Sequence, residues 1–283
     1  MTATDRDLAG RFIVVTGANT GIGRVTAERL AARGAHVVLA CRSEERTRPV
    51  LDAIGAAGGD ASYVALELGD FASVRACAAR VLAFDRPIDV LVNNAGLAGQ
   101  RGTTKDGFEL AFGANHLGHF LLTVLVASAL RKAPAARVVT VSSKAHYDAK
   151  NGVDYEAVRK PTRTITGVDE YGVSKLANVY FTRELARRLG PQVHSYALHP
   201  GVIASDVWRS VPWPIRPLLK LGMISNEEGA LTTLYCATSK EAGDQTGLYY
   251  DKCREKTPSP IAQDDALARK LWEKSVEFTG ADL

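Results

Sequence analysis

The chain has 283 residues, of which 46% are hydrophobic and 23% are charged. This composition supplies enough apolar residues for a large core and excludes wholesale disorder. The formal net charge is +4, which is too small an excess to indicate nucleic acid as the main partner. The four cysteines form no CxxC pair, so we expect free thiols in a reducing compartment rather than a zinc site or a disulfide framework.

No targeting or membrane segment is indicated. Residues 1–7 contain no apolar stretch of the kind that forms a signal peptide. The longest apolar stretch, near residues 120–130, is too short to span a bilayer. We therefore expect a cytoplasmic protein without membrane contact.

The order of elements predicts the fold class. Continuous apolar runs predict buried strands at residues 11–16, 35–40, 62–66, 88–92, 137–141, 193–198 and 248–250. Helical spacing predicts helices at residues 22–33, 44–57, 72–84, 113–131, 169–189, 227–238 and 264–278. This alternation predicts a Rossmann-type α/β fold, a doubly wound parallel sheet with helices on both faces, in a single domain over residues 1–283. In such a sheet, ligands bind beyond the carboxyl ends of the strands.

A glycine-rich turn joins the first predicted strand to the first predicted helix. Gly17 permits the tight turn, Gly21 lets a pyrophosphate approach the backbone, and Gly23 lets helix and strand pack closely. N–H groups at the helix start, together with the helix dipole, favour the phosphate charge. We predict a dinucleotide site here, with a bare structural turn as the alternative. Its predicted contacts are Gly17, Asn19, Thr20, Gly21, Ile22 and Gly23.

The residues after the second predicted strand indicate which cofactor fits. An acidic side chain at that point would accept from the 2′-hydroxyl of the adenine ribose and favour NAD(H). This chain has Ala40, Cys41 and Arg42 there, and the planar cation of Arg42 suits a 2′-phosphate. The sequence therefore predicts NADP(H), with NAD(H) as the alternative.

Four further segments stand at strand ends or on predicted helices, in the order Asn93-Asn94-Ala95-Gly96, Asn115 to Phe120, Val141-Ser142-Ser143 and Tyr171 to Lys175. With the glycine turn, they resemble the short-chain dehydrogenase/reductase family over about residues 8–278. Segments 115–123, 142–146 and 171–181 resemble its retinol-dehydrogenase-like branch. This resemblance implies NADP(H) chemistry on lipophilic alcohols and carbonyls.

The predicted catalytic group is a tyrosine beside a lysine. Tyr171 and Lys175 are four residues apart, so both side chains lie on one helix face. A free tyrosine has a pKa of about 10, and a nearby cation is needed for it to act as general acid in reduction and general base in oxidation. Ser143 would donate to the substrate oxygen, with Ser142 as the alternative. The resemblance implies that Asn115 orders a water in a proton relay; a structural amide is its alternative role.

The resemblance also implies cofactor contacts outside the glycine turn. Lys175 would hydrogen-bond to the nicotinamide ribose, next to Tyr171. Asn93 is the expected direct contact of the adenine ribose, with bracing of the sheet as the alternative role for part of residues 93–96. Glu67 replaces the aspartate that the family usually has near the adenine. The remaining predicted contacts are Leu68, Ala95, Gly96, Pro200, Ile203 and Ser205.

Two histidines raise the question of a metal. His116 and His119 are three residues apart on one predicted helix face. No acidic residue or cysteine has matching spacing, so we predict no metal site.

The substrate side is predicted from residues 205–225, which are rich in apolar side chains. We expect this segment to form a wall or lid over an apolar pocket, or simply to pack on the body of the protein. The predicted partner is a small lipophilic alcohol, aldehyde or ketone. A homodimer through residues 114–131 and 169–189 is also possible, as in the family.

The sequence thus favours an NADP(H)-dependent oxidoreductase that transfers a hydride between the nicotinamide and a lipophilic alcohol or carbonyl. A non-catalytic NADP-binding regulatory or scaffold protein of the same fold is the alternative, although such relatives usually lose the tyrosine or the lysine. A sugar-nucleotide epimerase or dehydratase is disfavoured by the short tail after Pro200.

Overall fold

The computed structural model describes residues 6–201, 224–243 and 245–283, and these form one eight-stranded sheet. The strand order is β3-β2-β1-β4-β5-β6-β7-β8, and every pairing is parallel except β7 with β8. The predicted doubly wound fold is therefore confirmed. The short strand β8 was not predicted. The strands are β1 (Phe12–Thr16), β2 (His36–Cys41), β3 (Asp60–Ala65), β4 (Val90–Asn93), β5 (Ala136–Val141), β6 (Val193–His199), β7 (Leu248–Asp251) and β8 (Arg254–Glu255).

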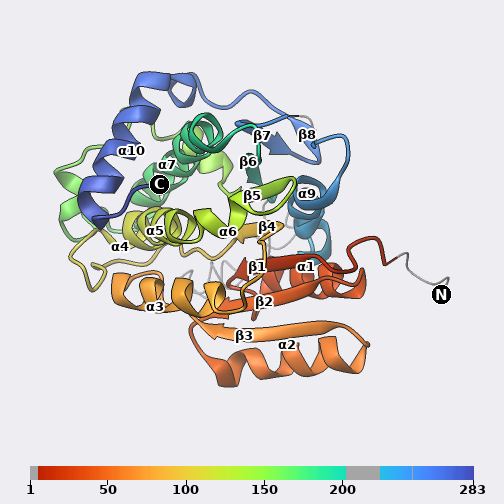
Figure 1. The fold of residues 1–283 in the computed structure, drawn as a ribbon. Coiled ribbons are helices and arrows are strands. Elements are labelled where there is room, and N and C mark those ends of the chain that lie inside the picture. The colour runs from red at the N-terminus through yellow and green to blue at the C-terminus, as the bar shows by residue number, and fades with distance from the viewer. Residues whose placement is uncertain (1–5, 202–223, 244) are drawn as a thin grey trace.

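Helices cover both faces of this sheet (Figure 1). Helices α3, α5 and α7 pack on one face, and α1, α2 and α9 pack on the other. Successive strand residues point to opposite faces, so both cores take apolar side chains from each strand and the runs are continuous. The α-helices are α1 (Gly21–Ala32), α2 (Glu44–Ala56), α3 (Phe71–Leu82), α4 (Leu110–Phe112), α5 (Gly118–Leu125), α6 (Ala127–Arg131), α7 (Val168–Leu189), α9 (Asn226–Thr238) and α10 (Asp265–Thr279). Shorter helical turns are η1 (Gly113–Leu117), η2 (Lys144–Tyr147), η3 (Ala157–Arg159) and η5 (Ile261–Gln263).

Residues 113–131 are helical as predicted, except at Val126, but they do not form one regular α-helix. A π-helical turn, η1, precedes α5, and Val126 separates α5 from α6 with φ −98° and ψ 6°. The wider turn at η1 brings Asn115 to the backbone of Leu97, where its amide makes two hydrogen bonds. Apolar periodicity reports which side of a helix is buried and is almost the same for an α-turn and a π-turn, so it gives no sign of this bulge.

Helix α10 covers the face that was expected to mediate a homodimer. Trp272 on α10 packs edge-on against Phe120 of α5, with ring centroids 4.9 Å apart, and stacks on Phe181 of α7 at 6.1 Å. The side chains of α5 from Gly118 to Val124 are buried within the chain. Part of α5 and α7 is thus covered by α10 within the chain, and the homodimer stays a prediction.

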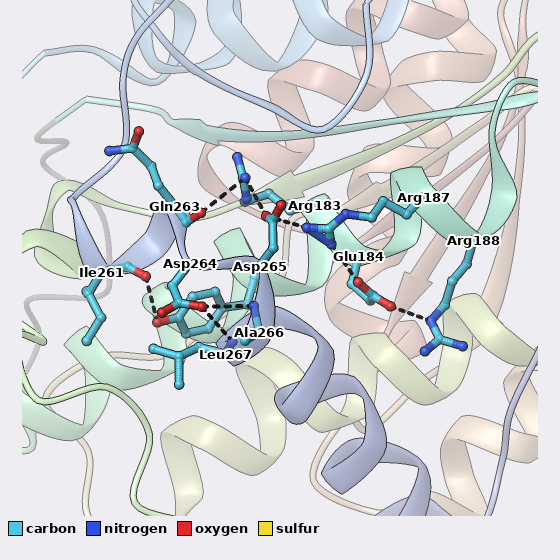
Figure 2. A network of polar contacts seen from close by, with 11 residues as sticks. Arg183, Glu184, Arg187, Arg188, Ile261, Gln263, Asp264, Asp265, Ala266 and Leu267 are labelled. Carbon is cyan, nitrogen blue, oxygen red and sulfur yellow. Dashed lines mark hydrogen bonds and ion pairs between the residues drawn. The ribbon is translucent and has the colours of Figure 1, made fainter.

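Charged groups hold the start of α10 on α7 (Figure 2). Arg183 and Arg187 of α7 both form ion pairs with Asp265, the first residue of α10. Glu184 pairs with Arg187 and Arg188 on its own helix, at 2.6 and 2.8 Å. Arg188 in turn lies 4.7 Å from the ring centroid of Trp272, so the network and the aromatic contact join the same two helices.

Within the described ranges, no helix is long and apolar enough to cross a membrane. The predicted contacts Ile203 and Ser205 lie outside the described residues. The predicted substrate-covering segment, residues 205–225, lies outside them as well, except for its last two residues.

Candidate active site

The glycine turn between β1 and α1 leaves the start of α1 open to an anion. Gly17 and Gly21 have φ values of +66° and +57°, a region that favours glycine. Thr20, the N-cap of α1, makes no side-chain capping hydrogen bond, and the first turn holds no acidic residue. The first N–H groups of a helix have no partner within it, so this end suits the diphosphate of a dinucleotide.

Gly23 allows close packing, and its contact with the cofactor stays a prediction. A Cβ at this position would lie 2.4 Å from the carbonyl oxygen of Gly17 and 2.4 Å from Nδ2 of Asn94. Only glycine therefore lets α1 approach the turn and the loop after β4 this closely. The predicted reason for Gly23 is confirmed by this geometry.

Thr16, at the end of β1, joins three parts of the site. Its Oγ1 accepts hydrogen bonds from the backbone N–H groups of Asn94 and Ala95, both at 3.0 Å. His119 Nε2 lies 2.9 Å from the same oxygen, and His119 Nδ1 lies 3.0 Å from the carbonyl oxygen of Asn115. A carbonyl only accepts, so Nδ1 carries the proton and Thr16 donates to Nε2. One buried hydroxyl thus couples β1, the loop after β4 and the π-turn.

The ends of β2 and β3 meet where the adenine ribose is predicted to bind. The side chain of Arg42 is 73% exposed, so its guanidinium is free to meet a phosphate. Glu67 Oε2 lies 3.6 Å from Arg42 Nη1, and Glu67 Oε1 accepts from the N–H of Gly69 at 3.0 Å. A carboxylate beside Arg42 was not foreseen from the sequence. An exposed pair of this kind contributes only about 0–1 kcal/mol, so it competes weakly with a bound phosphate.

The prediction that Asn93 touches the adenine ribose directly needs correction. Its side chain is fully buried, and its Nδ2 donates to Thr123 Oγ1 at 3.1 Å. No surface of Asn93 is left for a ligand, because the residue at the end of β4 points into the core. Leu68 is also buried, at 7% exposure, and packs against Gly118.

Gly96 borders the catalytic residues. A Cβ there would lie 3.3 Å from Asn115 Oδ1 and 3.4 Å from Lys175 Nζ. Asn115 is fully buried, and its Nδ2 also donates to Ser174 Oγ on α7 at 3.0 Å. The structural role weighed for Asn115 is therefore present: it ties the loop after β4 to the helix that carries the tyrosine. Its part in a proton relay stays a prediction.

Tyr171, Ser143 and Lys175 come together at the carboxyl end of β5. The Ser143 hydroxyl is close enough to Tyr171 to act on its pKa, and Lys175 Nζ lies 5.5 Å from the centroid of the Tyr171 ring. Burial raises the pKa of Tyr171, and Ser143 lowers it by a smaller amount. Burial also lowers the pKa of Lys175 to about 8, and its ammonium donates to the carbonyl oxygen of Val141 at 2.9 Å. At pH 7 the Tyr171 phenol is therefore protonated, and the buried Lys175 beside it is mostly charged.

The two candidate serines have different environments. Ser142 is 1% exposed, and its hydroxyl donates to the carbonyl oxygen of Lys175 at 2.7 Å, which fastens β5 to α7. Ser143 is only partly buried and faces Tyr171. The geometry therefore favours Ser143 as the residue that reaches a substrate.

The two histidines raised as metal candidates are neutral and make hydrogen bonds within the protein, through both ring nitrogens of His119 and through Nε2 of His116. His116 Nε2 donates to Ser275 Oγ of α10 at 2.9 Å, because that hydroxyl already donates to Leu271. Burial lowers the pKa of His116 to about 3 and that of His119 to about 4. No group of three or more His, Cys, Asp or Glu side chains suited to a metal occurs in the part of the chain that the structure describes.

A family model described as short chain dehydrogenase matches residues 11–213. The chain belongs to the short-chain dehydrogenase family. Mouse retinol dehydrogenase 12 is 39% identical over 98% of this chain and 89% of its own length, which places the chain in the retinol-dehydrogenase-like branch. The predicted family and branch are confirmed.

Solved short-chain dehydrogenases share the fold. A crystal structure of an uncharacterized protein from Mycobacterium paratuberculosis superposes with a TM-score of 0.78 at 34% identity, covering 97% of this chain and 95% of that one. A structure described as a NAD(P)-dependent gluconate 5-dehydrogenase from Beutenbergia cavernae, with bound NADP, has a TM-score of 0.71 at 28% identity, covering 88% and 97%. The short-chain dehydrogenase described here is therefore a hydride-transfer oxidoreductase of a family that uses NAD(P)(H).

Proposed function

We propose that this short-chain dehydrogenase is an NADP(H)-dependent reductase and dehydrogenase of lipophilic carbonyls and alcohols. The observation that carries the proposal is the grouping of the Ser143 and Tyr171 hydroxyls with the buried ammonium of Lys175, whose Nζ lies 5.5 Å from the centroid of the Tyr171 ring. In reduction, Tyr171 donates its phenolic proton to the carbonyl oxygen, and Ser143 donates a hydrogen bond to the same atom. In oxidation, Tyr171 takes the proton back.

The residues present fit a dinucleotide. The uncapped start of α1 and the open space at Gly21, where a Cβ would meet its nearest neighbour at 3.8 Å, suit its diphosphate. Because Gly96 has no side chain, space remains beside Lys175. A Cβ at residue 96 would lie 3.4 Å from Lys175 Nζ and would fill part of this space. When bound, the cofactor supplies or accepts the hydride. Lys175 would hold the ribose and supply the positive charge that stabilises the phenolate when Tyr171 acts as a base.

NADP(H) is favoured over NAD(H) by the exposed cation of Arg42, which directly follows β2 and is paired only weakly with Glu67. A relative at 28% identity contains bound NADP. The apolar substrate class is supported by the retinol dehydrogenases in the same branch and by two exposed apolar side chains that precede the tyrosine in the sequence by six and three residues. Ile165 is 87% exposed and Val168, at the start of the helix that carries Tyr171, is 50% exposed. We also propose a cytoplasmic location.

The test is NADPH oxidation with a panel of aldehydes and ketones of increasing apolar length, and with polar sugars of equal size. We expect the highest kcat/KM for long apolar carbonyls, and a clear preference for NADPH over NADH. Arg42→Asp should lose about 1.5–3 kcal/mol of binding to the 2′-phosphate, or roughly 10- to 100-fold in the KM for NADPH.

Arg46→Asp, the same charge change at an exposed position on α2, is the matched control and should leave both cofactors unaffected. Equal kcat/KM with NADH and NADPH in the unaltered protein would refute the cofactor assignment. Saturable NADPH binding with no turnover of any carbonyl in the panel would refute the enzymatic assignment.

A further inference from the structure

His146 is a buried histidine immediately behind Ser143. It lies in η2, three residues after Ser143, and its side chain has no exposed surface. Its Nδ1 lies 2.6 Å from the carbonyl oxygen of Ser143, and its Nε2 accepts from the backbone N–H of Ser259 at 3.1 Å. The first partner only accepts and the second only donates, so the ring is neutral with its proton on Nδ1. Burial lowers the pKa of His146, which keeps it neutral at pH 7.

The segment from Thr257 to Ile261, which bonds to His146 Nε2 through Ser259, is itself bonded to other parts of the protein. Next to His146, Tyr147 donates from its hydroxyl to the carbonyl oxygen of Thr257 at 2.6 Å. Two residues after Ser259, the carbonyl oxygen of Ile261 accepts from the hydroxyl of Tyr180 at 2.9 Å. Tyr180 belongs to α7, the helix that carries Tyr171. The chain from Thr257 to Ile261 therefore connects the back of the Ser143 turn to the tyrosine helix.

A second contact packs the same turn against helix α7. A Cβ at Gly172, the residue after Tyr171, would lie 3.0 Å from the carbonyl oxygen of Ala145. Glycine thus lets η2 rest directly on α7. The turn that carries the Ser143 hydroxyl therefore contacts two other segments. His146 bonds it to Ser259, and Gly172 lets it pack on α7.

We infer that His146 is a positioning residue that fixes the Ser143 hydroxyl relative to Tyr171 by tying the Ser143 turn to the backbone at Ser259. The inference rests on the proposed function, because it assigns Ser143 a catalytic hydrogen bond. An apolar side chain would fill the same space between Tyr147 and Tyr249, whose ring centroids lie 4.1 and 4.8 Å from that of His146. Only a histidine-like donor and acceptor satisfies both backbone groups.

The two hydrogen bonds can be separated by substitution. His146→Asn places an amide N–H near the position of Nδ1 and keeps the bond to Ser143, whereas His146→Gln places a carbonyl oxygen near Nε2 and keeps the bond to Ser259. His146→Leu keeps volume and loses both. We expect kcat to fall about 10- to 100-fold in the leucine variant, since small misplacements of a catalytic group cost this much, with KM for NADPH little changed. The glutamine variant should recover most of kcat, because it keeps the bond to Ser259, and the asparagine variant less.

His194→Asn is the matched control. This half-buried histidine lies near the start of β6, at the opposite end of the strand from the site, where its ring bonds to the carbonyl oxygen of Gln245. It should leave kcat within about twofold of the unaltered protein. A glutamine variant no more active than the leucine variant, or a leucine variant with unaltered kcat, would overturn the inference.

A second readout is independent of turnover. ¹⁵N-edited NMR of the histidine rings reports which nitrogen carries the proton, and we expect the Nδ1–H form for His146 across neutral pH. The Nε2–H form or a charged ring would overturn the inference even if a leucine variant fails to fold. If the unaltered protein reduces no carbonyl, the proposed function fails, whereas the NMR result still decides whether the tie exists.

Discussion

Replacing Lys175 by methionine should stabilise the protein while it destroys activity. Lys175 is 3% exposed, and burial lowers its pKa from 10.5 to about 8. Each pKa unit corresponds to about 1.4 kcal/mol, so the buried charge costs about 3 kcal/mol at any pH below 8. The substitution also loses the hydrogen bond to Val141, which is worth about 1 kcal/mol net. Asn178 Nδ2 still donates to that carbonyl at 3.2 Å, so no orphaned acceptor is left.

The expected net gain at pH 7 is about 1–3 kcal/mol in the free energy of unfolding. Between the folded pKa of about 8 and the unfolded value of 10.5, the unfolded chain binds more protons than the native protein. The unaltered protein therefore gains stability as pH rises through this range, and the advantage of the methionine variant shrinks. Urea unfolding at pH 7 and at about pH 9.5 measures both effects, with the exposed Lys132→Met as the control. A methionine variant less stable than the parent at pH 7, or an advantage that does not change with pH, would refute the reasoning.

Two further substitutions test how the site and the last helix are held. Thr16→Val leaves three buried partners of the hydroxyl unsatisfied, among them His119 Nε2, and should cost about 3–5 kcal/mol, against about 1 kcal/mol for Thr16→Ser. Urea unfolding measures the cost, and equal losses in the two variants would contradict the shared-hydroxyl role. Trp272→Ala should cost about 3–5 kcal/mol by the same measurement, because the ring is 2% exposed. The control Leu231→Ala, at a position 55% exposed, should cost under about 0.5 kcal/mol. A similar loss of stability in the Trp272 and Leu231 variants would show that the Trp272 contact does not hold α10.

The sequence predicted the sheet and the placement of the site because these depend on local patterns. Runs such as Ile13 to Val15 are buried on both faces of a parallel sheet, so they contain no polar interruption. The glycines at 17 and 21 have positive φ values, and few other residues tolerate them. Tyr171 and Lys175 lie on one helix, so their spacing alone places them together.

What the sequence left undetermined depends on contacts between distant segments. Asn93 is buried because its side chain bonds to Thr123 on α5. Helix α10 packs on α5 and α7 through the ring of Trp272. The links made by His119 and His146 were missed as well, although both stand inside motifs that had been noted. A histidine within an apolar run next to a functional motif was the available signal, since a buried ring needs two partners.

The central claim is that Tyr171 transfers the proton, and its most direct test is Tyr171→Phe. The measurement is kcat/KM for NADPH-dependent reduction of the best carbonyl in the panel, together with NADPH binding by fluorescence. We expect kcat/KM to fall by roughly 10²- to 10⁴-fold, because general acid catalysis contributes that much, while the Kd for NADPH changes by less than about threefold. Turnover within tenfold of the unaltered protein, with cofactor binding intact, would contradict the claim.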